Sequence, residues 1–160
     1  MGLDMYLKEK IWVGGCSNID VEIKAYKNGE PYKLPSSLQY LEFEKAYWRK
    51  ANHIHKWFVD NVQNGDDDCG EYWVSIEQLE ELKEKCRQVV ELAKTSPYKE
   101  EKSFKIYTNP EEFTKILPTS EGFFFGSTEY DEWYVRDCEY TLEALKHLNP
   151  EFEYYYTSSW

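Results

Sequence analysis

Two of the three histidines in this chain, His53 and His55, stand two residues apart, as the histidines of some metal sites do. Apolar residues in the same segment recur at helical spacing, for example at Ile54, Phe58 and Val62. In a helix, residues two positions apart differ by about 200° around the axis, so the two imidazoles point away from each other. The sequence therefore predicts no metal site here, and we expect no cofactor.

The helical geometry gives the two histidines different surroundings. His55 is expected beside Trp48 and Asn52 at the margin of the buried stripe, whereas His53 is expected on the outer face with Arg49. A neutral imidazole close to an amide and an indole can bind a base, a sugar hydroxyl or a phosphate. The other interpretation of His55 is a hydrogen-bonded residue at the edge of the core. The candidate ligand-binding residues of this segment are Trp48, Arg49, Asn52 and His55, although Arg49 does not share the flank of His55.

A second pair of candidates, Trp133 and Asp137, is separated by four residues in a later segment with helical spacing. Both border the predicted buried stripe, so they either line a cleft or form a packing edge with a surface acid. The preceding Gly126–Thr128 could hold an anion on free backbone N–H groups. Acidic residues in the next turn, such as Asp131, already satisfy the helix dipole, which disfavours a phosphate there.

Three consecutive carboxylates, Asp66, Asp67 and Asp68, form an acidic loop between two expected helices. An EF-hand calcium loop has this placement, but Gly70 stands at its fifth position, where a ligand side chain is needed, and Glu71 at its sixth, where glycine is needed. We therefore expect a solvated loop or an acidic surface for a cationic partner. All three aspartates are candidate partner-binding residues.

The composition limits the class of partner. The net charge is −11, and this disfavours a general nucleic-acid binder and an anionic membrane surface, since both need lysine and arginine. No stretch is apolar enough to cross a bilayer, and the first residues lack the pattern of a signal peptide. The four cysteines are scattered without a CxxC pair, which is typical of reduced thiols in a cytoplasmic protein.

The elements that position these residues follow from periodicity and turn signals. Strands are expected at about 4–13, 21–26 and 38–43, with an Asn28-Gly29 hairpin turn after the second. Amphipathic helices are expected over about 46–62, after the Ser75 capping box and after Thr128.

The remaining segments complete the expected fold. Pro110 opens a short helix, Gly122–Gly126 is expected to be a short buried strand, and 152–156 a closing strand. Together these elements predict an α+β fold with a mainly antiparallel sheet and about three amphipathic helices packed on it. We expect one domain over residues 1–160, with a variable excursion at about 95–118.

Three segments together resemble a family of small proteins encoded by tailed bacteriophages and prophages. They are Met1–Leu7, Tyr47–Val59 and Gly122–Tyr134. The resemblance implies a setting, the cytoplasm of a bacterial host during infection or lysogeny, and it transfers no catalytic residue. By analogy with small phage accessory proteins, it also implies action on host factors or on components of host defence.

These observations favour a phage-encoded accessory protein that acts by binding and not by catalysis, with counter-defence as one purpose. Its target is either a nucleotide-like small molecule or a host protein. The first alternative is a small hydrolase that uses His55 with a carboxylate, since general-base catalysis needs such a pair. The second alternative is a structural or assembly protein, and the oligomeric state stays open.

Overall fold

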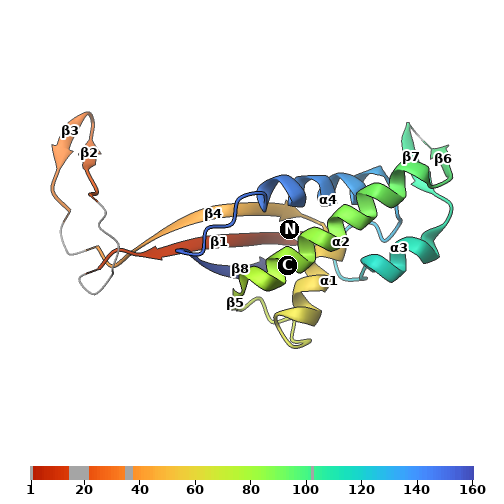
Figure 1. Cartoon of the computed structure of the whole chain (residues 1–160), viewed down its shortest axis with the longest axis horizontal. Coiled ribbons are helices and arrows are strands. Elements are labelled where there is room, and N and C mark those ends of the chain that lie inside the picture. The colour runs from red at the N-terminus through yellow and green to blue at the C-terminus, as the bar shows by residue number, and fades with distance from the viewer. Residues whose placement is uncertain (1, 15–21, 35–37, 102) are drawn as a thin grey trace.

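The centre of the fold is a four-stranded antiparallel sheet. The computed structural model describes residues 2–14, 22–34, 38–101 and 103–160. The strand order is β4-β1-β8-β5, so the C-terminal strand lies inside the sheet between β1 and β5 (Figure 1). The four strands are β1 (Asp4–Trp12), β4 (Tyr40–Arg49), β5 (Glu71–Val74) and β8 (Glu153–Ser159).

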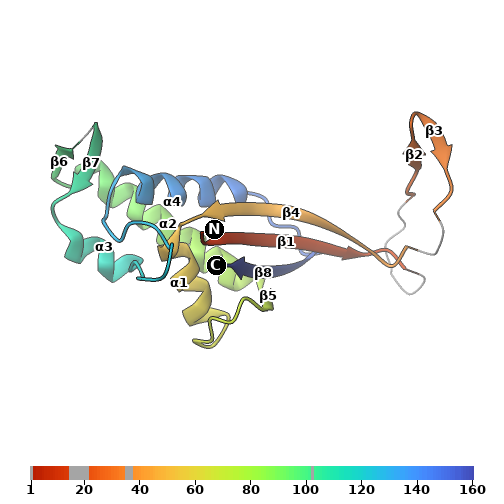
Figure 2. The same ribbon diagram turned by 180° about the vertical axis from the view of Figure 1, so that it is seen from behind.

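Helices cover one face of this sheet. The longest two, α2 and α4, lie side by side, and α1 packs at the end of β4 (Figure 2). The helices are α1 (Asn52–Asn61), α2 (Ile76–Thr95), α3 (Pro110–Ile116) and α4 (Glu132–Ala144). The expected α+β fold, with a mainly antiparallel sheet and amphipathic helices packed on it, is therefore confirmed. None of the helices in the described part of the chain has the length and apolar content needed to cross a membrane.

The core lies between the helices and the inner face of the sheet. Leu3, directly before β1, and Met5 and Leu7 of β1 point into the core at every second position. All three side chains are fully buried. The outer face carries charge instead: Lys8 and Lys10 of β1 form ion pairs with Glu42 of β4 and Glu71 of β5. The two faces of the sheet therefore differ sharply in polarity, and the apolar one sets the register.

Two short hairpins stand apart from the main sheet. The first joins β2 (Ala25–Lys27) and β3 (Glu30–Tyr32) through Asn28-Gly29, and both turn residues have positive φ angles, as predicted. The second joins β6 (Tyr98–Glu101) and β7 (Phe104–Tyr107) inside the region expected to be an excursion. The strand predicted at 21–26 is wrong in its first part, since residues 22–24 have no secondary structure and β2 begins only at Ala25. Val21 and Cys16 lie outside the described residues. The described cysteines, Cys69, Cys86 and Cys138, are free.

The start of α2 confirms its predicted signal, whereas α4 begins at Glu132, later than the start predicted after Thr128. Ser75 and Gln78 form a complete capping box at the start of α2. Asp131 caps α4, because its carboxylate accepts the N–H groups of Trp133 and Tyr134 at 2.9 and 3.0 Å. The Asp131 cap fixes the start of α4, whose first turns face the start of α1.

The helix predicted over 46–62 is wrong in its first part. Residues up to Arg49 belong to β4, where buried Ala46 and Trp48 alternate with exposed Tyr47, and the helix begins only at Asn52. Pairing of β4 with β1 decides this, because the apolar residues fit both a helical and an alternating pattern. The expectation for His53 is also wrong, because α4 and the 120–127 loop cover its side of α1, so that it is buried and not on the outer face.

The buried strand predicted at Gly122–Gly126 is also wrong. The segment is an irregular loop in which Phe123 is 80% exposed and Phe124 50% exposed, and only Phe125 is buried. Phe124 and Gly126 have φ angles of 65° and 96°, which are incompatible with a strand. A continuous run of phenylalanines therefore does not mark a core strand here.

Candidate ligand-binding site

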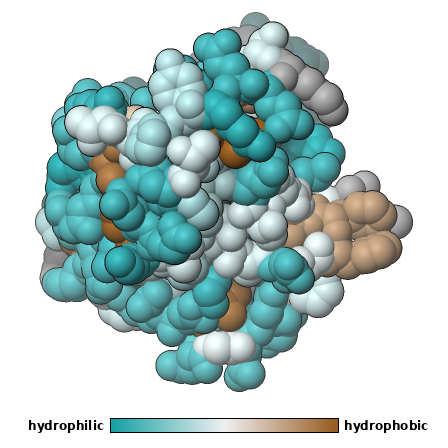
Figure 3. Space-filling model, turned by 90° about the vertical axis from the view of Figure 1, so that its right-hand side faces the viewer, coloured by the Kyte–Doolittle hydropathy of each residue, from teal (hydrophilic) through white to brown (hydrophobic). Residues whose placement is uncertain are grey.

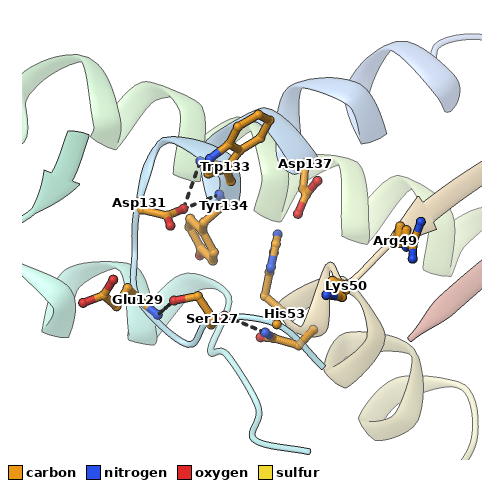
Figure 4. Close-up of a pocket in the computed structure, with 11 residues that line it drawn as sticks. Arg49, Lys50, His53, Ser127, Glu129, Asp131, Trp133, Tyr134 and Asp137 are labelled. Atoms are coloured by element: carbon orange, nitrogen blue, oxygen red, sulfur yellow. Dashed lines mark hydrogen bonds between the residues drawn. The ribbon is translucent and has the colours of Figure 1, made fainter. Parts of the chain in front are cut away.

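A cavity of about 250 Å³ lies where the end of β4, the start of α1, the loop before α4 and the first turns of α4 meet (Figure 4). We call it the His53 pocket. Four of the six ligand-binding candidates from the sequence line it, although they come from distant parts of the chain. These four are Arg49, Asn52, Trp133 and Asp137.

The junction between β4 and α1 sets one wall of the His53 pocket. Lys50 has a φ angle of 61°, its N–H donates to the carbonyl of Leu3 at 2.7 Å, and its carbonyl accepts the N–H of Asn52 at 2.9 Å. This tight turn ends the strand and starts the helix within three residues. It leaves Arg49 and Lys50 at the rim and places His53 inside the first helical turn.

His53 forms the floor of the pocket and is only 3% exposed. Its ring packs against the ring of Tyr134, with 4.3 Å between the centroids. The buried Nε2 atom has no hydrogen-bond partner among the described residues. Burial lowers the pKa of His53 to about 3, so the imidazole is neutral at physiological pH. The pocket thus contains a polar nitrogen that the protein itself leaves unsatisfied, and such atoms call for an explanation.

Asp137 faces the same cavity from α4 (Figure 4). Within the described ranges, no side chain or backbone N–H donates a hydrogen bond to its carboxylate. Burial, with a smaller contribution from the charge of Asp131, raises the pKa of Asp137 to about 7. A carboxyl group that exchanges its proton near neutral pH inside a cleft is a common mark of a functional site.

The rim adds charge and an aromatic surface. The Arg49 side chain is 61% exposed, and its Nε lies 3.9 Å from the Asp4 carboxylate, so it is only weakly held. Trp133 is 52% exposed, and the guanidinium of Arg136 lies over its ring at 4.8 Å from the centroid. The pocket therefore combines cations and a flat aromatic ring with an acid at its centre.

Asn52 shapes the pocket and has little capacity left to bind a ligand. Its Nδ2 donates to the carbonyls of Ser127 at 2.7 Å and Phe125 at 3.3 Å, and its Oδ1 accepts the N–H of Ser120 at 3.1 Å. The amide is buried, so these bonds are protected from water. They fix the 120–127 loop against α1, and this loop forms another wall of the cavity.

His55 lies outside the His53 pocket and is 1% exposed, so its predicted place at the margin of the core is corrected. Its Nδ1 lies 2.7 Å from the hydroxyl of Tyr156 and its Nε2 2.9 Å from Oδ2 of Asp67. Asp67 accepts a further bond, at 3.0 Å, from the indole N–H of Trp160. Since a carboxylate only accepts, Nε2 of His55 donates to Asp67, and Nδ1 shares a hydrogen bond with the Tyr156 hydroxyl. His55 therefore clamps α1, the acidic loop and β8 together.

The other candidates from the sequence are placed apart from the pocket. Trp48 is buried in the core, where its indole N–H donates to Thr141 at 2.8 Å. In the acidic loop Asp67 turns inward to His55, Asp68 accepts the N–H of Gly70 at 2.8 Å, and Asp66 is exposed. The three aspartates do not form one uniform acidic surface.

Comparisons of the chain with protein-family models, with curated proteins and with solved structures find no match. The site is therefore interpreted from its own residues. Sequence reasoning missed His53 and Tyr134 as lining residues, because the cover over this side of α1 comes from α4 and the 120–127 loop, which are distant in sequence. No local pattern around His53 predicts that cover.

The His55 clamp predicts that Asp67→Ala destabilises the fold. The variant leaves the Nε2–H of His55 buried without an acceptor, so the free energy of unfolding should fall by about 2 kcal/mol. Chemical denaturation measures this. Asp66→Ala is the matched control at an exposed position, and its effect should stay within about 0.5 kcal/mol. Equal losses in the two variants would contradict the clamp.

The raised pKa of Asp137 predicts a specific pH dependence of stability. Between about pH 4 and pH 7 the folded state holds a proton on Asp137 that the unfolded state has released, so stability falls as the pH rises through this window. Asp137→Asn lacks this titration. The variant should gain stability relative to the wild type between pH 4 and pH 7, as measured by urea denaturation across that range. A constant difference would show that the Asp137 pKa is not raised.

Proposed function

We propose that this chain is a non-catalytic binding protein whose His53 pocket holds a nucleotide-like small molecule. The observation that carries the proposal is the buried, unpartnered Nε2 of His53 in a cavity that it shares with the donor-free carboxyl of Asp137. Leaving a buried polar group unsatisfied costs about 1–3 kcal/mol. A ligand with its own donors and acceptors would remove that cost on binding.

The size and shape of the pocket suit part of a nucleotide. At about 250 Å³ it lies below the usual range of drug-sized sites, which begins at about 300 Å³. A base is small and flat enough to enter it, while a sugar and a phosphate remain at the rim. Trp133 offers an exposed ring beside the opening, and stacking on an aromatic ring is a common way to hold a base.

The rim charges suit an anionic group. Arg49 and Lys50 stand together at the end of β4, in a chain whose net charge is −11. Arginine binds phosphate oxygens through two parallel hydrogen bonds, and lysine adds a point charge. Two adjacent cations beside an aromatic ring and a polar floor are the recognition elements that a nucleoside phosphate requires.

The arrangement favours binding over hydrolysis. A hydrolase built on His55 has its carboxylate, since Asp67 lies 2.9 Å away, but Tyr156 occupies the other ring nitrogen. A general base needs a free nitrogen within reach of the substrate. His53 faces the pocket, but a pKa of about 3 makes it a weak base at neutral pH. In the phage setting that the sequence resemblance implies, sequestration of a nucleotide signal would serve counter-defence.

Binding to the pocket predicts a ligand-dependent rise in melting temperature for at least one of AMP, GMP, CMP and UMP. At 100 times its Kd, a ligand adds about 2.7 kcal/mol to the free energy of unfolding. Arg49→Ala should weaken binding of the nucleotide about tenfold and leave the matching nucleoside unaffected. Arg87→Ala, at an exposed site on α2, is the control and should change neither. Absence of any shift across the panel at millimolar concentration would contradict the proposal.

A second candidate function, docking onto a host protein, is favoured by one surface feature. Phe123 and Phe124 are exposed, with 4.2 Å between their ring centroids, and Figure 3 shows an apolar projection on a largely hydrophilic end of the molecule. The loop that carries them is fixed by Asn52 and strained at Phe124, where φ is 65°. A rigid apolar pair on an acidic protein suits a partner with an apolar cleft and a basic rim.

The docking surface predicts different effects for stability and capture. The double variant Phe123→Ala with Phe124→Gly should not lose stability, since glycine relieves the positive φ angle. The double variant should no longer bind the host protein that the wild type binds. A titration of the two purified proteins at several salt concentrations should show the same loss of binding. If the double variant and the wild type bind the purified protein equally, the phenylalanine pair has no part in docking.

A further inference from the structure

We infer that the His53 pocket selects a guanine-type base, one whose edge presents two adjacent N–H donors, through the carboxylate of Asp137. This inference rests on the proposed function and names the chemical class of its ligand. It is carried by the hydrogen-bonding capacity that the pocket leaves unused, and not by the cations at the rim, which serve any nucleotide.

The two polar groups on the pocket floor have different unused capacity. The ionised carboxylate of Asp137 offers two acceptor oxygens, and no group in the described part of the chain donates to them. Neutral His53 offers its buried Nε2, which donates when the proton sits on that nitrogen. Asp137 comes from α4 and His53 from α1, and both point into one cavity (Figure 4). The floor is thus a pair of acceptors beside one donor.

Among the common bases, guanine has the complementary edge. Its N2 amine and N1–H are adjacent donors that match the two oxygens of a carboxylate, and its O6 is the next acceptor along the same edge. Adenine and cytosine place a donor beside an acceptor, and uracil places a single donor between two acceptors. An ionised carboxylate beside an imidazole N–H therefore satisfies guanine fully and leaves each of the other three with a mismatch.

The charged and titratable groups around Asp137 decide when its carboxylate is available. Asp131 at the start of α4 and Glu129 in the preceding loop add negative charge, whereas Arg49 and Lys50 at the β4–α1 junction oppose them, and His53 is neutral. With its pKa raised to about 7, Asp137 is largely protonated at pH 6 and largely ionised at pH 8. Two ligand donors favour the ionised form, so guanine binding should release a proton and tighten as the pH rises.

The opposite dependence holds for a base with a donor beside an acceptor. Adenine and cytosine pair best with a protonated carboxyl, which offers one donor and one acceptor. Their binding should weaken as the pH rises through the same window. The sign of the pH dependence therefore distinguishes the two classes of base at one residue.

Calorimetric titration of the full chain tests the inference with guanosine, inosine, adenosine and cytidine at pH 6 and pH 8. Nucleosides are used because a phosphate titrates near pH 6 and would obscure the signal. Guanosine should bind about tenfold more tightly at pH 8 than at pH 6, as the ionised fraction of Asp137 changes by that factor. Inosine, which lacks the N2 amine, should bind more weakly than guanosine.

Variants of two carboxylates complete the test. Asp137→Asn should abolish both the preference for guanosine and its pH dependence, whereas Glu139→Gln, at an exposed position on the same helix, should retain them. Preference for adenosine or cytidine, or guanosine binding that is flat with pH, would overturn the guanine assignment and leave the proposed function standing. Absence of binding by every nucleoside, and by the four nucleotides as well, would overturn both.

Discussion

The buried amide of Asn52 is the constraint on which the candidate site depends. Its hydrogen bonds to the backbone of Ser120, Phe125 and Ser127 hold a loop that has no secondary structure of its own against the first turn of α1. The neighbouring residue on the helix is His53, so the same turn that fixes the loop also fixes the floor of the pocket. Without this bridge two walls of the cavity would be independent of each other.

The site combines two features that reduce the stability of the fold. A buried nitrogen of His53 has no partner in the described part of the chain, and the carboxyl of Asp137 is held in surroundings that disfavour its charge. The contrast with His55 is informative, because that imidazole is equally buried and has both nitrogens bonded. One histidine stabilises the fold, and the other has unused hydrogen-bonding capacity, which the proposed ligand would satisfy.

Local signals predicted the parts of this protein that depend on neighbours in sequence. The capping box at Ser75, the turn at Asn28-Gly29 and the stripe of α4 are all read within a few residues, and all are confirmed. The boundary at Lys50 was missed because pairing of β4 with the distant β1 overrides a helical pattern. The partners of Asn52 lie about 70 residues away. Four of the eleven residues that line the site therefore followed from the sequence, and the position of His53 did not.

The central claim is that His53 keeps its ring for a ligand, and nitrogen NMR of the three histidine side chains tests it most directly. In the free protein the account predicts a His53 ring that stays neutral from pH 5 to pH 8. The exposed His147 serves as the reference. Saturation with GMP should move the Nε2 resonance of His53 and leave that of His147 unchanged. A His53 ring that gains a proton near pH 6.5, or that responds to none of AMP, GMP, CMP and UMP, would contradict the account.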